Sequence, residues 1–317
     1  MREISKVCDN KAVITGKLME CTVDERTSKT SGAPYASVIF KVRVAQQYGG
    51  NDAEVSEITL RDMSSKFSKK DNTILQHFTN IENMRALKTT QLSGYENADM
   101  IYVGRGALRE NYFTDNSGTQ RDGFDVTAGF GARAVSATSK QQAVFNTEVY
   151  ILNLREEIGK DEQLTGRVII HGAIVQYGGK VDVLDFIIEN PQNAQAFMSR
   201  FQEGETTRIW GYIRCATREV EKVIENTESW GDANTVKPST EYVRELIVSG
   251  GNPMPNDEDN SYDPADIRKA MAERDVRMQE EKENKKNAPR MTSKAPVAEK
   301  PVASAAPWGD DTEEYSL

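Results

Sequence analysis

Apolar and polar residues alternate along several stretches of the first half of the chain, and this alternation predicts β-strands. The clearest stretch is Ala36–Val44, where even-numbered residues such as Phe40 share one face and odd-numbered residues such as Lys41 lie on the other. A helical or mixed segment is expected at Asn72–Leu87, where apolar residues recur at irregular three-to-four spacing. Further strands of this half are expected at Ala12–Cys21, Glu54–Leu60, Met100–Phe113 and Asp122–Val135.

The second half of the chain repeats this order of elements. A hairpin is predicted where the turn sequence Tyr177–Lys180 joins two apolar stretches. A short helix is expected at Asn190–Phe201, because Asn190 is a favourable N-cap and Pro191 suits the first helical position. The strands of this half are expected at Gly166–Tyr177, Val181–Ile188, Thr206–Val220 and Tyr242–Ser249.

Glycines recur at matching places inside the strands of the two halves. Gly16 matches Gly172, each in the first strand expected for its half, and Gly106 matches Gly211. Glycine lets a sharply coiled strand bend without a Cβ clash, as small barrels require. The sequence therefore predicts a mainly β protein of two tandem OB-fold five-stranded barrels. One large β-sandwich is the alternative.

The last segment differs in composition from both predicted barrels. Residues 262–286 are charged and favour a helix, and residues 288–307 are rich in Pro, Ala, Ser and Lys, which cannot bury enough surface to fold. We therefore predict an OB-fold domain at 1–152 and a second one at 153–255. Residues 256–317 are expected to form a charged linker, partly helical, that ends in a disordered acidic tail.

The distribution of charge changes what the composition implies about partners. The 317 residues carry 40 Lys and Arg against 49 Asp and Glu, and this net charge of −9 argues against nucleic acid as a partner. The excess is uneven, because residues 1–152 have a net charge of +1, whereas 153–255 and 256–317 each have −5. A nearly neutral domain can still present a basic groove. The first barrel thus stays a candidate for nucleic-acid binding.

Several classes of protein are disfavoured by what the sequence lacks. It has no stretch of roughly 18–20 apolar residues that could cross a membrane and no visible signal peptide. Its three cysteines, Cys8, Cys21 and Cys215, cannot all pair, so reduced thiols and a cytoplasmic location are expected. The two histidines, His77 and His171, lack metal-ligand spacing. Without a phosphate-binding loop or nucleophile elbow, no cofactor and no enzymatic activity are expected.

The outer positions of the predicted first barrel combine basic and aromatic residues. A barrel that binds a single strand needs rings on which bases stack and cations that meet phosphates. By the two-residue period of a strand, Arg105 and Arg109 share a face. The alternative is that these residues are merely the polar outer face of a sheet. The candidate DNA-binding residues of this barrel are Lys17, Lys41, Arg43, Tyr48, Arg105, Arg109, Tyr112, Phe113 and Arg121.

The second barrel offers one strand with the same combination. On it Trp210 and Tyr212 alternate with arginine on the face opposite Ile209 and Ile213. The candidate DNA-binding residues of this strand are Arg208, Trp210, Tyr212 and Arg214. The alternative is a buried contact between the two domains, which the negative charge of the segment supports.

Three stretches of the first segment resemble the bacterial and phage single-stranded DNA-binding proteins. They are Asn10–Leu18 (NKAVITGKL), Gly32–Val44 (GAPYASVIFKVRV) and Tyr102–Val126 (YVGRGALRENYFTDNSGTQRDGFDV). They are similar to the opening strand, the second strand and the long β-hairpin of that family. The resemblance implies strand-contacting roles for Arg109, Phe113 and Arg121.

The C-terminal end is similar in kind to the acidic tail with which that family recruits its partners. The residues expected to bind partners are Trp308, Asp310, Asp311, Glu313, Glu314, Tyr315 and Leu317. The tail lacks the terminal Pro-Phe of the family, and two barrels in one chain depart from its usual plan. A monomer, a dimer or other homo-oligomer, and a phage-type variant all stay open.

These features together favour a non-enzymatic protein that binds single-stranded DNA without strong sequence preference. It would protect DNA during replication, recombination and repair in a bacterial cell, with a phage origin also open, and recruit replication or recombination proteins through its tail. One alternative is a recombination mediator or protein-binding scaffold built on OB-folds. A nuclease is a weaker alternative, because the abundant carboxylates show no arrangement typical of a metal cage.

Overall fold

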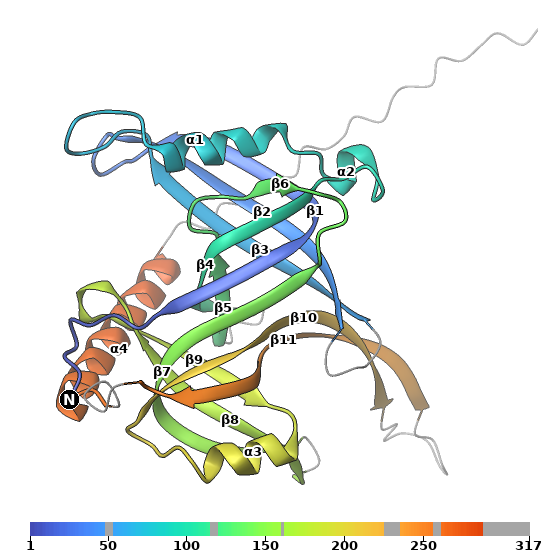
Figure 1. The fold of residues 1–317 in the computed structure, drawn as a ribbon, viewed down its shortest axis with the longest axis vertical. Coiled ribbons are helices and arrows are strands. Elements are labelled where there is room, and N and C mark those ends of the chain that lie inside the picture. Colours follow the sequence, from blue (N-terminus) through green and yellow to red (C-terminus); the bar gives the residue numbers. More distant parts are fainter. Residues whose placement is uncertain (48–52, 115–119, 160–161, 225–234, 256–260, 288–317) are drawn as a thin grey trace, which may run out of the picture. The chain divides into compact units, whose positions relative to one another are not determined.

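A computed structural model describes the chain except for residues 48–52, 115–119, 160–161, 225–234, 256–260 and 288–317. Long β-strands dominate the described part (Figure 1). The first half contains β1 (Asn10–Thr27), β2 (Pro34–Gln47), β3 (Ala53–Ser65), α1 (Gln76–Asn83), η1 (Met84–Ala86), α2 (Thr90–Ser93), β4 (Met100–Thr114), β5 (Gln120–Thr127) and β6 (Arg133–Val135). The second half contains β7 (Gln142–Ile158), β8 (Leu164–Val175), η2 (Tyr177–Gly179), β9 (Val181–Ile188), α3 (Pro191–Met198), β10 (Thr206–Ile224), β11 (Thr235–Pro253) and α4 (Pro264–Asn287).

The strands of the first half close into a five-stranded barrel. β1 pairs with β2 and β2 with β3, both antiparallel, and β3 then pairs in parallel with β5. β5 pairs with β4, and β4 returns to β1. Between β3 and β4 the chain forms α1, whose Phe78 and Ile81 are buried. This strand order, with a helical segment before the fourth strand, is that of an OB-fold.

The second half follows the same strand order. β7, β8 and β9 pair in sequence, β9 pairs in parallel with β11, and β10 joins β11 to β7. The helix α3 again precedes the fourth strand of its barrel. As predicted, Asn190 caps α3, because its side-chain oxygen accepts hydrogen bonds from the backbone N–H groups of Gln192 and Asn193. The prediction of a mainly β protein with two OB-fold barrels is confirmed.

The first strand of the second barrel is the element that the sequence pattern does not predict. β7 lacks steady alternation, because residues 147–151 of this strand are all buried and its last residues are largely exposed. The predicted domain boundary after residue 152 falls inside this strand. Gly172 consequently lies in β8, the second strand, and is not the counterpart of Gly16 in β1. Gly106 and Gly211 do correspond, since they lie in β4 and β10.

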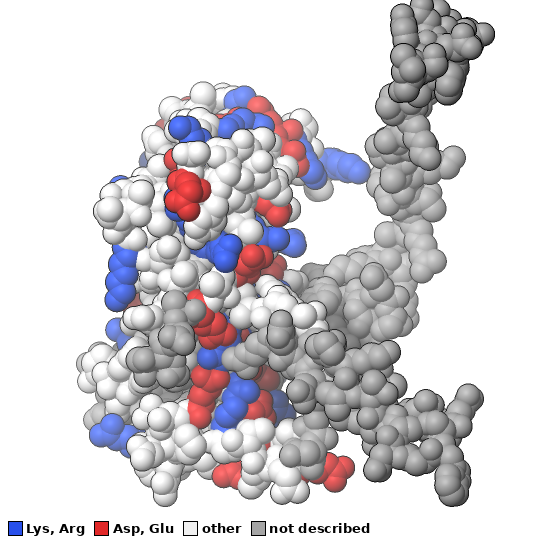
Figure 2. All heavy atoms as spheres, turned by 90° about the vertical axis from the view of Figure 1, so that its right-hand side faces the viewer, with Lys and Arg blue, Asp and Glu red and all other residues white. Residues whose placement is uncertain are grey.

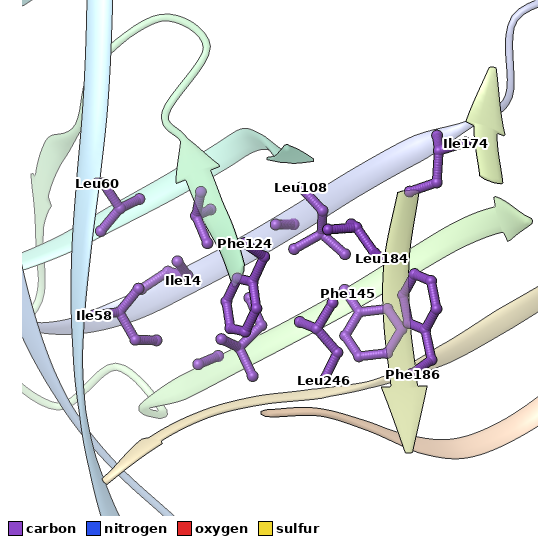
Figure 3. Close-up of a cluster of buried hydrophobic side chains, with 14 of the residues drawn as sticks. Ile14, Ile58, Leu60, Leu108, Phe124, Phe145, Ile174, Leu184, Phe186 and Leu246 are labelled. Carbon is purple, nitrogen blue, oxygen red and sulfur yellow. The ribbon is translucent and has the colours of Figure 1, made fainter. Parts of the chain in front are cut away.

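The two barrels share a sheet and a core within one compact unit, residues 1–278. Residues Asn10–Thr15 of β1 pair with Gln142–Thr147 of β7, so main-chain hydrogen bonds cross from one barrel to the other. Buried side chains of both barrels form one cluster (Figure 3), in which the rings of Phe145 and Phe186 lie 5.6 Å apart. The two barrels are therefore not separate domains joined only by a linker.

The charged segment after the second barrel contains the predicted helix. In α4, Ile267 and Ala270 are buried, and Arg274 forms an ion pair with Glu110 of β4. Residues 279–317 form a separate unit, of which the structure describes only the end of α4. The tail beyond Asn287 lies outside the described residues. No helix in the described part of the chain is both long and apolar enough to cross a membrane.

Candidate nucleic-acid interface

Two predicted cations of the first barrel meet over a tyrosine ring. Lys17 of β1 and Arg43 of β2 are register partners. The Nζ atom of Lys17 lies 5.8 Å, and the Cζ atom of Arg43 5.3 Å, from the ring centroid of Tyr95. Tyr95 is 40% exposed and follows α2. Cations over an aromatic face are attracted by the ring quadrupole, so these three side chains form one positively charged, ring-bearing surface.

Lys41 lies on the same outer face of β2 as Arg43 but has an acidic partner. Its Nζ atom is 3.4 Å from Oε1 of Glu20 on β1, and both side chains are partly exposed. An exposed pair of this kind contributes little energy and exchanges easily with other anions. Tyr48, the next predicted residue along the chain, lies outside the described residues.

The two arginines of β4 are both exposed, but they have different partners. The Cζ atom of Arg105 lies 4.8 Å from the ring centroid of Phe130. Nη1 of Arg109 is 3.3 Å from Oδ2 of Asp182, which belongs to the second barrel. Burial raises the pKa of Asp182, and the nearby Arg109 opposes this rise without cancelling it. Arg109 therefore spans the junction between the barrels.

For the hairpin residues that carry the family resemblance, the structure describes only how their backbones pair. Phe113 of β4 and Arg121 of β5 are register partners, and Tyr112 pairs with Asp122. The side chains of Tyr112, Phe113 and Arg121 lie outside the described part of the structure.

A break in the predicted fifth strand produces a site that the sequence analysis missed. The expected strand Asp122–Val135 is split into β5 and β6, because Gly129, Phe130 and Gly131 all have positive φ values, of 51, 114 and 70°. Glycine adopts such values freely, whereas phenylalanine rarely does. The Gly-Phe-Gly sequence was the available signal. The turn leaves the Phe130 ring 45% exposed beside Arg105.

A second ring and cation lie next to this turn. The Cζ atom of Arg133 is 5.3 Å from the ring centroid of Tyr102, and the Tyr102 ring covers Gly104 so closely that any Cβ there would collide with it. Neither Tyr102 nor Arg133 is among the predicted DNA-binding residues. We call the hollow at this turn the GFG cavity, with a volume of about 550 Å³; it is lined by residues that include Asn80, Asn83, Tyr102, Arg105, Phe130 and Arg133.

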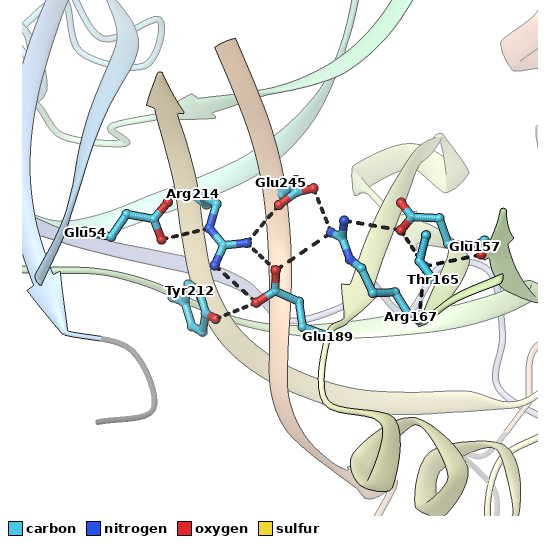
Figure 4. Close-up of polar contacts among 8 residues, drawn as sticks. All are labelled: Glu54, Glu157, Thr165, Arg167, Glu189, Tyr212, Arg214 and Glu245. Atoms are coloured by element: carbon cyan, nitrogen blue, oxygen red, sulfur yellow. Dashed lines mark hydrogen bonds and ion pairs between the residues drawn. The ribbon is translucent and has the colours of Figure 1, made fainter. Parts of the chain in front are cut away.

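In the second barrel, the prediction that Arg214 meets DNA is corrected. Its side chain is 7% exposed and donates hydrogen bonds to Glu54 of the first barrel, Glu189 and Glu245 (Figure 4). Burial alone would lower the pKa of Arg214, but the hydrogen bonds to Glu189 and Glu245 outweigh it and raise that pKa. The alternative interpretation, a buried contact between domains, describes this residue.

The other predicted residues of β10 also have contacts within the protein. Arg208 donates to Oδ2 of Asp9 at 2.9 Å and to Oε1 of Glu148 at 2.6 Å. The hydroxyl group of Tyr212 donates to Oε2 of Glu189 at 3.2 Å. Trp210 is half-buried, and its ring covers Gly250 of β11, where a Cβ would lie only 2.7 Å from it. Both arginines of this predicted site are therefore neutralised by carboxylates.

The surface charge agrees with these pairings. On the face drawn in Figure 2, basic and acidic side chains are interleaved and do not form one continuous basic surface. Among the described residues, no ion pair joins a carboxylate to Arg43, Arg105 or Arg133. The described residues contain no group of three His, Cys, Asp or Glu side chains placed to hold a metal ion. The predicted tail residues, Trp308 to Leu317, lie outside the described residues.

Comparison with known proteins gives a family for the chain. The model of the YorF family matches residues 9–286. The chain belongs to the YorF family. No curated protein matches the sequence of this YorF-family chain.

Two solved structures are similar to this YorF-family chain at a low level. One is the wild-type single-stranded DNA-binding protein from Thermus aquaticus, with a TM-score of 0.46, 9% identity, and coverage of 79% of this chain and 96% of that one. The other is a deletion mutant of the same Thermus protein, with a TM-score of 0.43, 9% identity, and coverage of 79% and 97%.

Proposed function

We propose that the chain binds single-stranded DNA, without strong sequence preference and without enzymatic activity, through the outer face of its first barrel. The observation that carries this proposal is that four cations of this face lie over three rings that are each at least partly exposed. The cations are Lys17, Arg43, Arg105 and Arg133, and the rings are those of Tyr95, Phe130 and Tyr102. Rings accept the faces of unstacked bases, and the cations beside them meet phosphates. Bases in a duplex are already stacked, so single strands are favoured.

A second cavity extends the surface available to a strand. It has a volume of about 520 Å³ and shares Gly129 with the GFG cavity. Its lining includes the cations Arg26 and Arg61 and the exposed apolar side chains Ile39 and Met63. Two cavities that meet at one residue support a binding path longer than a single nucleotide.

Fluorescence anisotropy of labelled oligo-dT and of a duplex of equal length tests this function over a range of salt concentrations. We expect tighter binding of oligo-dT, and the logarithm of its affinity should fall linearly with the logarithm of the salt concentration as counterions are released. Equal affinity for the duplex would remove the role of base stacking. Failure to bind oligo-dT at low salt would overturn the proposed function and favour a protein-binding scaffold.

The acidic end of the chain enters this proposal as a partner-binding element for replication, recombination and repair proteins. The sequence from Trp308 to Leu317 combines carboxylates with two aromatic residues and a leucine. Its carboxylates would compete with DNA for the cations of the first barrel. Deletion of 308–317 is expected to leave oligo-dT affinity unchanged or raise it. A loss of DNA binding in that variant would contradict this role of the tail.

A further inference from the structure

The turn between β5 and β6 holds an aromatic residue in a strained conformation without burying it. Phe130 has φ +114°, and the residue is 45% exposed. A non-glycine residue in such a region is energetically costly and persists only where its surroundings impose it. Because the ring is not completely buried, hydrophobic burial alone does not offset this cost. The position of the ring therefore calls for another explanation.

A buried carboxylate fixes this turn. Oδ2 of Asp62, whose side chain is 6% exposed, accepts hydrogen bonds from the backbone N–H groups of Phe130 at 2.9 Å and Gly131 at 2.6 Å. The same oxygen is 2.9 Å from Nε2 of His77, whose ring stacks on Phe130 with centroids 4.8 Å apart and an interplanar angle of 18°. Nδ2 of Asn80 donates to the carbonyl oxygen of Phe130 at 3.4 Å. These contacts hold both the backbone and the ring.

The ring so held forms part of the GFG cavity. The volume of about 550 Å³ lies within the roughly 300–1,000 Å³ range of ligand sites. The planar guanidinium group of Arg105 lies over the Phe130 ring, and Arg133 and Tyr102 form a second such pair in the lining. A planar cation on a planar ring occupies the geometry that a stacked base would take.

We propose that the GFG cavity receives one unstacked base of the bound strand, with Phe130 as its stacking ring. Asp62 and His77 are positioning residues, which keep the turn and the ring in place. The base takes the place that Arg105 holds over the ring, and Arg105 then pairs with a neighbouring phosphate. This inference rests on the proposed function, because it assigns one contact of the same surface.

The first test replaces the ring by an apolar side chain that cannot stack, Phe130→Leu, in the full-length chain. Oligo-dT binding should weaken by roughly 5- to 150-fold, while its salt dependence stays the same because no phosphate contact is lost. The matched control is Tyr177→Leu, which removes a ring that is 90% exposed in the second barrel and should leave binding unchanged.

The outcomes separate this inference from the proposed function. If the natural protein binds oligo-dT and Phe130→Leu binds equally well, the stacking site is overturned and DNA binding stands. If the natural protein does not bind oligo-dT at low salt, both are overturned. The site is also contradicted if Phe130→Leu lowers both the affinity and its salt dependence. The same holds if Phe130→Leu lowers the affinity no more than Tyr177→Leu does.

A second variant reports on stacking directly. Phe130→Trp is made in a chain whose three tryptophans, Trp210, Trp230 and Trp308, are replaced by phenylalanine. Oligo-dT should quench the fluorescence of the new indole, since a stacked base contacts it. Addition of Asp62→Asn should reduce that quenching, because Oδ1 already accepts from the N–H of Met63 and one amide oxygen cannot replace both carboxylate oxygens. Absent quenching overturns the stacking role, and quenching unaffected by Asp62→Asn overturns the positioning role.

Discussion

In the first barrel, Arg43, Arg105 and Arg133 lie over aromatic rings, whereas in the second barrel Arg208 and Arg214 lie among carboxylates. Both barrels have the same strand order, and both offer strands on which arginine and aromatic residues occur together. The difference comes from what faces each arginine across neighbouring strands. A guanidinium over a ring keeps its charge available to an external anion, and one held by several carboxylates does not.

Much of the acidity of the second barrel is used in ion pairs inside the molecule. Residues 153–255 have a net charge of −5, yet several of their acids are used inside the molecule. Glu189 and Glu245 neutralise Arg214, and Glu245 also accepts a hydrogen bond from Arg167 at 2.7 Å. These pairs lie inside the second barrel, and Arg214 is joined to the first barrel through Glu54. Their contribution to the net charge therefore says little about the outer face of the first barrel.

The largest effect is expected from Arg214→Gln, which leaves Glu54, Glu189 and Glu245 without their shared cation. Loss of one partner from a buried ionic network costs about 3–5 kcal/mol, so the free energy of unfolding in urea should fall by about that amount. Arg155→Gln is the control, because its pair with Asp185 is exposed and contributes about 0–1 kcal/mol. Unchanged stability together with weaker DNA binding would mean that Arg214 contacts DNA.

A smaller effect, on binding and not on stability, is expected from Tyr95→Leu in the first barrel. The variant removes the ring under Lys17 and Arg43 and should weaken oligo-dT binding by about 1–3 kcal/mol. Because the ring is 40% exposed, its loss should change the melting temperature little. Anisotropy and thermal unfolding measure the two quantities. A variant that melts early and binds normally would mark Tyr95 as a structural residue.

The carboxylates around Arg214 should make the stability of the protein depend on pH. Burial would raise the pKa of Glu189, but the hydrogen bonds and charge of Arg214 outweigh it, so that pKa is lowered. The resulting stabilisation is complete above the ordinary glutamate pKa of about 4.3 and is lost as the pH falls through the lower folded value. Urea unfolding between pH 7 and pH 3 should therefore show a loss of stability that Glu189→Gln reduces. An equally steep loss in the variant would refute this origin.

The smallest expected effect is on the salt dependence of DNA binding. If Arg133 meets one phosphate, Arg133→Gln should reduce the slope of log affinity against log salt concentration by about 0.7. Arg208→Gln should leave this slope unchanged, because that arginine is paired with Asp9 and Glu148. Equal changes in both variants would mean that the two barrels contribute alike and would remove the distinction between them.

Local sequence patterns predicted the elements with strong short-range signals. The alternation of Ala36–Val44, the turn after Tyr177 and the Asn190 cap each depend on residues close in the chain, and each has its counterpart in the structure. β7 was missed because both faces of its middle are covered: Glu148 pairs with Arg2 and Tyr150 lies against Tyr262, so the strand loses the alternation of a half-buried strand. The break at Phe130 was missed because alternating small and apolar residues there suggest a continuous strand.

The two similar β-rich halves, the charged helical segment and the nearly neutral first half all follow from the order of residues along the chain. Which charges stay available depends on the three-dimensional fold. Glu54, on β3, neutralises Arg214 on β10, and Asp62 fixes the turn that presents Phe130. Such contacts depend on how strands distant in the chain align in three dimensions. Composition and periodicity describe each strand alone, so they cannot specify its partner across the barrel.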